Sequence, residues 1–285
     1  MKKRIKLVAS DIDGTIIDRS NNISPKNFEA IKKIQNKKIP FAICTGKSYS
    51  VSKGICEQFD ANYGIFGNGT QIVDLKTGKE LHRNILTQED LLFVATMAKR
   101  FHYHIHIYTD NAIITEKLKY MDLRNFKLKK KNGVKSLKFK IVLNIVDYIE
   151  KHKPEVFSAV ITTEDTTLQE FKNLLNINDR MECTYINKRG EYRDQVINKD
   201  YEYLNITPTN IDKDQALEFL SKYLKVPRTQ VLAIGDNVND LNMVKNSGVG
   251  VAVNDAYDDL KEVATYVTET KVSDGAFAEA INKYI

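Results

Sequence analysis

The chain contains 285 residues, which at about 150 residues per domain favours two domains. Hydrophobic residues make up 42% of the chain and charged residues 28%, a composition typical of a globular protein with a sizeable core. No apolar run approaches the roughly 20 residues that a membrane helix needs, so we expect no membrane partner. The apolar run of residues 5–9 is too short for a secretion signal and is closed by Ser10 and Asp11.

The formal net charge of +6 suits an anionic small substrate or a lysine-rich surface, and is weak evidence for nucleic acid. The lysine-rich run of residues 127–135 has no interleaved aromatic side chains for base stacking. We therefore expect a solvated loop there and no nucleic acid partner. The 3 cysteines, Cys44, Cys56 and Cys183, are not spaced as a metal or redox pair, which indicates reduced thiols in a cytoplasmic protein.

Short apolar runs and helical patterns alternate along the first part of the chain. Buried strands are predicted over residues 6–10, 41–44 and 63–66. Ser24 suits the N-cap of a helix and Pro25 its first residue. Apolar residues then recur at helical spacing: Phe28, Ile31 and Ile34. Short apolar strands separated by helices are typical of a parallel sheet.

The same alternation returns near the C-terminus. Helices are predicted over residues 214–224 and 241–245, and strands over 231–234, 249–253 and 266–268. Both ends of the chain therefore favour one α/β domain.

The middle of the chain has a different pattern. Apolar and polar residues alternate over 102–107, and Asp110-Asn111 suits a hairpin turn before the next strand. A strand is predicted over residues 157–161 and a helix over 168–175. These features indicate a separate α+β domain inserted into the α/β domain.

Polar residues suited to phosphate chemistry follow three of the predicted strands. They are Asp11 and Asp13, then Thr45 and Gly46, then Asp236, Asn239 and Asp240. Because ligands bind at the carboxyl ends of the strands in an open parallel sheet, we expect these groups to meet in one crevice. Several carboxylates so close together repel one another, and oxygen ligands of this kind suit Mg²⁺. The sequence thus predicts a magnesium site.

Four segments of this chain resemble the motifs of the haloacid dehalogenase superfamily. Asp11–Thr15 resembles the first motif, Thr45 the second, Lys213 the third, and residues 235–240 the fourth. Their order and spacing match across the whole chain. The long insertion between the second and third motifs resembles the large α/β cap of the Cof-type sugar-phosphatase branch.

The resemblance implies a Rossmann-like parallel-sheet core of residues 1–83 and 207–285, with an α+β cap of residues 84–206 that sets specificity. It also implies a Mg²⁺-dependent phosphatase for small phosphorylated metabolites, with sugar phosphates favoured. We expect a monomer or a homodimer.

The resemblance assigns roles residue by residue. Asp11 forms an aspartyl phosphate, Asp13 acts first as general acid and then as general base, and Lys213 neutralises charge on both the nucleophile and the phosphoryl group. The implied phosphate ligands are Thr45, Gly46, Lys213 and Asn239. The implied metal ligands are Asp11, the backbone carbonyl of Asp13, and Asp236, with Asp240 supporting the site. Thr15 is expected to hydrogen-bond within its own loop.

The sequence departs from the common pattern at three places. Lys47 stands where arginine is usual. Asp212 and Asp214 flank Lys213, where they are expected either to compete for it or, for Asp212, to cap the helix. Asn237 replaces a frequent glycine, a change that asparagine tolerates even in a left-handed backbone.

Three histidines, His102, His104 and His106, occupy alternate positions and would share one face of a strand. We expect an exposed sheet face or a cap surface over the active site, because such positions fan out instead of converging on a metal. Cys44 precedes Thr45 and is expected to point into the core.

Two other functions fit parts of the pattern. A phosphomutase of the phosphomannomutase type shares a similar motif and cap, and is distinguished by returning phosphate to a sugar instead of water. A non-catalytic regulatory module is the second alternative, and the complete set of acidic residues argues against it.

Overall fold

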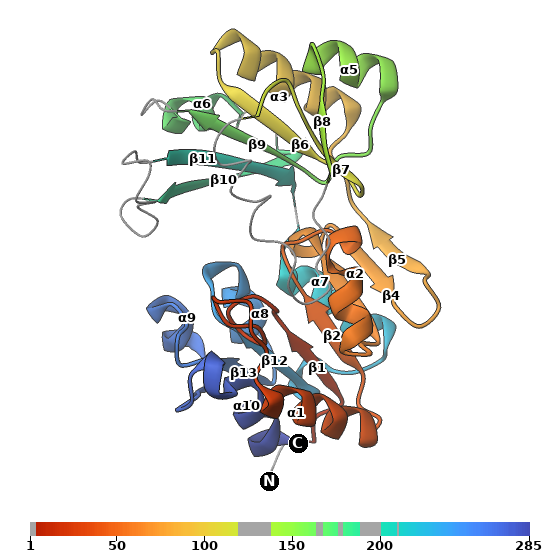
Figure 1. Cartoon of the computed structure of the whole chain (residues 1–285), viewed down its shortest axis with the longest axis vertical. Coiled ribbons are helices and arrows are strands. Elements are labelled where there is room, and N and C mark those ends of the chain that lie inside the picture. The colour runs from red at the N-terminus through yellow and green to blue at the C-terminus, as the bar shows by residue number, and fades with distance from the viewer. Residues whose placement is uncertain (1–3, 119–137, 164–167, 176–178, 189–200, 210) are drawn as a thin grey trace. The chain divides into compact units, whose positions relative to one another are not determined.

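The computed structural model describes residues 4–118, 138–163, 168–175, 179–188, 201–209 and 211–285 (Figure 1). The lysine-rich run of residues 127–135 lies outside the described residues. The described chain divides into two compact units. One comprises residues 4–83 and 211–285, and the other the described residues between 84 and 209.

The first unit is built on an eight-stranded sheet with the order β14-β13-β12-β1-β2-β3-β4-β5. The strands are β1 Leu7–Ser10, β2 Phe41–Cys44, β3 Tyr63–Phe66, β4 Gln71–Asp74, β5 Glu80–Arg83, β12 Val231–Gly235, β13 Val249–Ala252 and β14 Tyr266–Val267. All pairs from β14 to β3 are parallel, and β4 and β5 extend the sheet as antiparallel strands.

The central strands β1, β2, β12 and β13 are buried at every residue, as expected for a parallel sheet covered on both faces. The helices of this unit are α1 Pro25–Asn36, α2 Tyr49–Gln58, α7 Lys213–Tyr223, α8 Leu241–Lys245, α9 Asp258–Val263 and α10 Ala276–Tyr284. Val8 packs in one apolar cluster with residues of α1 and α10, whereas Leu7 and Ala9 pack in a second cluster with α7. Successive side chains of β1 therefore point to opposite faces of the sheet and pack in two separate hydrophobic layers.

The second unit contains a six-stranded sheet with the order β10-β11-β9-β6-β7-β8. Its strands are β6 His104–Tyr108, β7 Ala112–Thr115, β8 Lys138–Ile141, β9 Ser158–Thr163, β10 Met181–Lys188 and β11 Tyr201–Pro208. Only the β7–β8 pair among these is parallel. Three helices share one apolar cluster with this sheet: α3 Gln88–Arg100, α5 Ile145–His152 and α6 Leu168–Leu175. The α/β core and the α+β character of the insertion are thus confirmed.

The predicted exposed histidine face is wrong. His102 lies outside β6, in a left-handed turn (φ 57°) just after α3. Such a residue commonly ends a helix, so His102 belongs to the turn instead of the strand. His104 and His106 are buried, with ring centroids 4.5 Å apart.

None of the described helices is long and apolar enough to span a membrane.

Candidate active site

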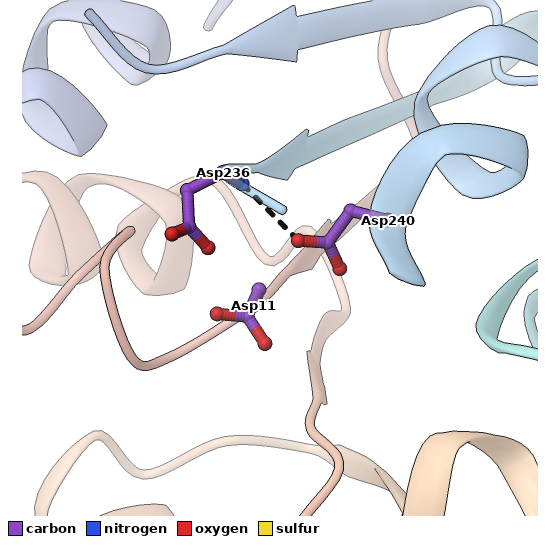
Figure 2. A group of neighbouring side chains, drawn as sticks. All are labelled: Asp11, Asp236 and Asp240. Carbon is purple, nitrogen blue, oxygen red and sulfur yellow. Dashed lines mark hydrogen bonds between the residues drawn. The ribbon is translucent and has the colours of Figure 1, made fainter. Parts of the chain in front are cut away.

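Three buried carboxylates lie together at the carboxyl ends of β1 and β12. Asp11 follows β1 directly, whereas Asp236 and Asp240 follow β12 (Figure 2). Ligand oxygens of all three lie within 4.8 Å of one another. The exposed fractions of Asp11, Asp236 and Asp240 are 6%, 7% and 0%. The adjacent parallel strands β1 and β12 therefore bring together acids that lie more than two hundred residues apart in the sequence.

The turn after β1 is shaped by Gly14. Its φ of 88° is left-handed, and a Cβ atom there would lie 2.2 Å from Oδ2 of Asp236. Glycine adopts this backbone conformation without strain, and its lack of a side chain leaves room for the carboxylate of Asp236. The hydroxyl of Thr15 donates to Oδ1 of Asp236 at 3.4 Å. The expectation that Thr15 hydrogen-bonds within its own loop is confirmed for its backbone, whose N–H donates to the Ile12 carbonyl at 3.3 Å. The side chain instead reaches Asp236, which β12 places beside it.

Lys213 is the first residue of α7, and its side chain is fully buried. Its Nζ donates at 2.6 Å to Oδ1 of Asp11 and at 2.6 Å to Oδ1 of Asp240. Burial alone would lower the pKa of Lys213, but the two carboxylates raise that pKa above its ordinary value. Lys213 is therefore a fixed positive charge beside Asp11.

Both oxygens of Asp240 are engaged by the protein. Oδ1 accepts from Lys213, and Oδ2 accepts from the backbone N–H groups of Asp236 (3.1 Å) and Asn237 (3.2 Å). Figure 2 shows the bond to Asp236 as a dashed line. A Cβ atom on Gly235 would lie 2.5 Å from the Cβ of Asp240, so glycine permits this close approach. Asp240 therefore links Lys213 to the backbone of the loop that follows β12.

The charges of this cluster favour a cation. Burial raises the pKa of Asp11 well above its usual range, and the neighbouring Asp240 and Asp236 raise it further against the opposing effect of Lys213. Burial and Asp240 raise the pKa of Asp236 to about 7. The cluster thus contains three carboxylates and one ammonium, and a divalent cation with oxygen ligands fits the remaining negative charge.

Thr45 and Gly46 follow β2. Thr45 is buried, and its hydroxyl accepts from the Lys47 N–H at 3.2 Å, which closes a tight turn. Gly46 is exposed at the tip of that turn. The Lys47 ammonium lies 2.6 Å from Oδ1 of Asp13, and both side chains are partly exposed. Asp13 therefore lies outside the buried carboxylate cluster, beside a cation.

Asn239 is exposed, and its Nδ2 donates to Oδ1 of Asn68 at 3.0 Å. Asn68 was not among the residues predicted for the site. The only sequence signal is its place between two glycines just after β3, at the same edge of the sheet as Asp11 and Thr45.

The two acids that flank Lys213 have other partners. Asp212 caps α7 by accepting from the Gln215 N–H at 2.7 Å, which confirms the capping alternative. Asp214 accepts from Arg228 and, at 2.6 Å, from Asn246. The expected competition for Lys213 is therefore wrong, because consecutive helical residues point in different directions.

Two further expectations concern single residues. Asn237 has an extended backbone (φ −127°), so the left-handed conformation considered for it is not needed. Its side chain instead accepts from the Val238 N–H at 2.7 Å. Cys44 points into the core as predicted, and burial raises the pKa of its thiol to about 12.

Comparisons with known proteins identify the family of this chain. The sequence profile of the haloacid dehalogenase-like hydrolases matches residues 8–281. The chain is 27% identical to 5-amino-6-(5-phospho-D-ribitylamino)uracil phosphatase YcsE of Bacillus subtilis (strain 168), over 99% of this chain and 96% of that protein. It is 26% identical to the HMP-PP phosphatase of Yersinia enterocolitica serotype O:8, over 90% of this chain and 86% of that protein.

Solved structures show the same fold. A haloacid dehalogenase-like hydrolase from Bacteroides thetaiotaomicron matches with a TM-score of 0.81 and 24% identity, over 99% of this chain and 100% of the other. TM0651 from Thermotoga maritima matches with a TM-score of 0.80 and 20% identity, over 98% and 97%. The resemblance found in the four motifs is thereby confirmed: the chain belongs to the haloacid dehalogenase-like hydrolase family, and it is a phosphatase.

Proposed function

We propose that this phosphatase hydrolyses phosphate monoesters of sugars and related small metabolites in a Mg²⁺-dependent reaction, with Asp11 as the nucleophile. The observation that carries the proposal is the buried cluster of Asp11, Asp236 and Asp240, in which the ammonium of Lys213 contacts Asp11 and Asp240. The cluster combines a nucleophile, a fixed positive charge and cation ligands at the edge of the sheet where ligands bind.

Asp11, Asp236 and the backbone carbonyl of Asp13 would hold Mg²⁺ directly. Asp240 supports the site, since its two oxygens already accept hydrogen bonds from Lys213 and from backbone N–H groups. When bound, Mg²⁺ would neutralise the carboxylates and reduce their repulsion of the substrate phosphate.

Asp11 would begin the reaction. One carboxylate oxygen forms a bond to phosphorus while the bond from phosphorus to the leaving oxygen breaks, and Asp13 gives that oxygen a proton. The buried ammonium of Lys213 stabilises the negative charge that spreads over the transferring group.

Asp13 would then complete the cycle. Asp13, now a carboxylate, takes a proton from a water molecule that attacks the aspartyl phosphate, and the bond from phosphorus to Asp11 breaks. Inorganic phosphate and the Asp11 carboxylate are the products. The partly exposed position of Asp13 suits this role, because the leaving group departs to solvent and the attacking water arrives from it.

The substrate phosphate would be held by the turn after β2 and by the loop after β12. The Thr45 hydroxyl and the Gly46 N–H lie in the first, and Asn239 lies in the second. Phosphoryl transfer needs chiefly such positioning and charge stabilisation.

The sugar-phosphate preference rests on the relatives. The name of YcsE specifies a phosphorylated ribityl chain, which is a polyol related to a sugar. We therefore place phosphorylated sugars and polyols first in the range of substrates.

Phosphate release by the wild type and by Asp11→Asn, with Mg²⁺ or EDTA, tests the proposal. We expect Asp11→Asn to lose at least about a thousandfold in kcat, as for other nucleophile replacements. Asp60→Asn removes an exposed acid far from the cluster in the sequence and should retain activity. The wild type should carry phosphate on the peptide containing Asp11 after an acid quench. Equal activity of Asp11→Asn, or activity undiminished in EDTA, would contradict the mechanism.

A panel of phosphorylated metabolites tests the substrate class separately. Sugar and polyol phosphates should have the highest kcat/KM. A clear preference for substrates without a sugar or polyol would overturn this part of the proposal only.

A further inference from the structure

Asn68 occupies a left-handed turn beside the proposed phosphate site. It lies in the short turn Gly67–Gly69 between β3 and β4, with φ 56° and ψ 29°. Asparagine and glycine are the residues that adopt this left-handed conformation most readily. Asn68 therefore has a defined left-handed backbone at the carboxyl end of β3, where the proposed site lies.

The backbone of this turn is bonded to the turn that follows β2. The Asn68 N–H donates to the Thr45 carbonyl at 3.1 Å, and the Gly67 N–H donates to the Lys47 carbonyl at 2.9 Å. These two bonds lie on either side of Gly46. The conformation of Gly67–Gly69 therefore fixes the backbone of residues 45–47.

The side chain of Asn68 reaches a second loop. Its Oδ1 accepts from Nδ2 of Asn239 at 3.0 Å. A Cβ atom on Gly46 would lie 3.0 Å from the same Oδ1, which places the carboxamide directly against the Gly46 backbone. Asn68 thus contacts both loops that carry the proposed phosphate ligands, and those loops are about two hundred residues apart in the sequence.

We propose that Asn68 is a positioning residue for phosphate recognition, which it performs by fixing the Asn239 carboxamide; this inference rests on the proposed function. The Asn239 side chain is exposed and would otherwise sample several rotamers. A primary amide has two N–H donors, so one bonds to Asn68 and the second is directed to a phosphate oxygen. Asn68 orders this donor before the phosphate arrives.

Two substitutions of Asn68 separate the hydrogen bond from the backbone conformation. Asn68→Gly keeps the left-handed turn and removes the acceptor. Asn68→Asp keeps an acceptor for Asn239 and adds a charge. Each is combined with Asn239→Ala, and the Kd of inorganic phosphate is measured by calorimetry with Mg²⁺ present. Asn21→Gly is the matched control, because Asn21 is also left-handed (φ 60°) but lies in the turn of residues 18–22, outside the two loops that carry the proposed phosphate ligands.

Removal of Asn239 should raise the phosphate Kd about tenfold in the wild type and in Asn68→Asp, as expected for one lost hydrogen bond. Asn239→Ala should not raise the Kd further in the Asn68→Gly background. In that background the Asn239 amide is no longer ordered, so its contribution to phosphate binding is already lost. Asn21→Gly should bind phosphate within about twofold of the wild type, the range expected for an independent surface site. Within each Asn68 background, the Kd with Asn239 is compared with the Kd without it. The charge that Asn68→Asp adds affects both values equally, so it cancels in their ratio.

Additive losses in the Asn68→Gly and Asn239→Ala pair would overturn the inference, as would a wild-type Kd in Asn68→Gly. If phosphate release is intact but the losses are additive, only the role of Asn68 fails. If the Kd values follow the expected pattern but no substrate is hydrolysed, the proposed function fails and the role of Asn68 stands. A wild type that binds no phosphate would overturn the role of Asn68, and it would overturn the proposed function as well if no substrate is hydrolysed.

Discussion

Asp240 holds Lys213 in place: the Nζ of Lys213 lies 2.6 Å from Oδ1 of Asp240, and both side chains are fully buried. The same ammonium lies 2.6 Å from Oδ1 of Asp11. Asp240 therefore sets the position of the cation that faces the proposed nucleophile, while its other oxygen, Oδ2, accepts from backbone N–H groups.

Asp240→Asn should destabilise the protein and reduce its activity. The substitution leaves a buried ammonium with one carboxylate fewer, a change that costs about 3–5 kcal/mol when a buried pair is broken. The free energy of unfolding from urea denaturation and the kcat measure the two effects. Asp259→Asn, at an exposed acid of α9, should stay within about 0.5 kcal/mol of the wild type. An equally small change in Asp240→Asn would show that Lys213 does not depend on Asp240.

Gly14→Ala should weaken Mg²⁺ binding by at least about tenfold, the range seen when groups that orient metal ligands are lost. A Cβ atom at Gly14 would lie 2.2 Å from Oδ2 of Asp236, so the carboxylate must move. Gly78→Ala is the matched control, because Gly78 is also left-handed (φ 73°) but has no atom within 4 Å of the added Cβ. Both variants should lose about 1–2 kcal/mol through backbone strain.

The Mg²⁺ dependence of activity and of thermal stability compares the two glycine variants. The loss of Mg²⁺ affinity should be confined to Gly14→Ala. A similar loss in both would attribute the effect to backbone strain alone.

Stability in EDTA should fall as the pH rises from about 4 to 7. The pKa of Asp236 is raised to about 7 from an ordinary value of 3.8, so the folded protein binds more protons than the unfolded chain in this window. The free energy of unfolding therefore decreases as this extra proton leaves the folded protein. Urea denaturation at several pH values measures the slope, and Asp236→Asn should reduce it.

Mg²⁺ should stabilise the protein more at pH 8 than at pH 6. Below about 7 a proton occupies Asp236 and competes with the cation, whereas above that pKa the carboxylate is ready to bind it. The increase in Tm on adding Mg²⁺ gives the comparison. An increase that is the same at both pH values would show that Asp236 is not a ligand.

Asn27→Ala should destabilise the protein by about 1–3 kcal/mol, because two buried backbone groups lose their partner. Asn27 is fully buried; its Nδ2 donates to the Ile16 carbonyl at 2.9 Å, and its Oδ1 accepts from the Ala278 N–H at 3.1 Å. Asn282→Ala, at an asparagine on the outer part of α10, is the control and should stay close to the wild type. Chemical denaturation measures both variants, and equal stabilities would contradict the role of Asn27.

The strands of the parallel sheet and the acids at their ends were predicted from the sequence because both are local features. Strands β1 and β12 are short apolar runs, and the motif residues follow them directly. The grouping of Asp11, Thr45 and Asp236 needs only the rule that parallel strands end at one edge. Lys213 begins a helix, and it was assigned by the resemblance to the third motif. The antiparallel strands β4 and β5 carry a weaker apolar pattern and were not predicted.

Only the tertiary structure decided which partner each polar side chain has. Thr15 bonds to Asp236, Asp214 to Arg228, and Asn239 to Asn68, and none of these pairs follows from a local pattern. Lys213 and Asp11 are 202 residues apart in the sequence. The sequence by itself determined the residues available at the edge of the sheet, through hydrophobic periodicity and short motifs. Their pairing was decided by the parallel register of β1 and β12 and by the start of α7, because hydrogen bonds depend on distances that only the packed chain defines.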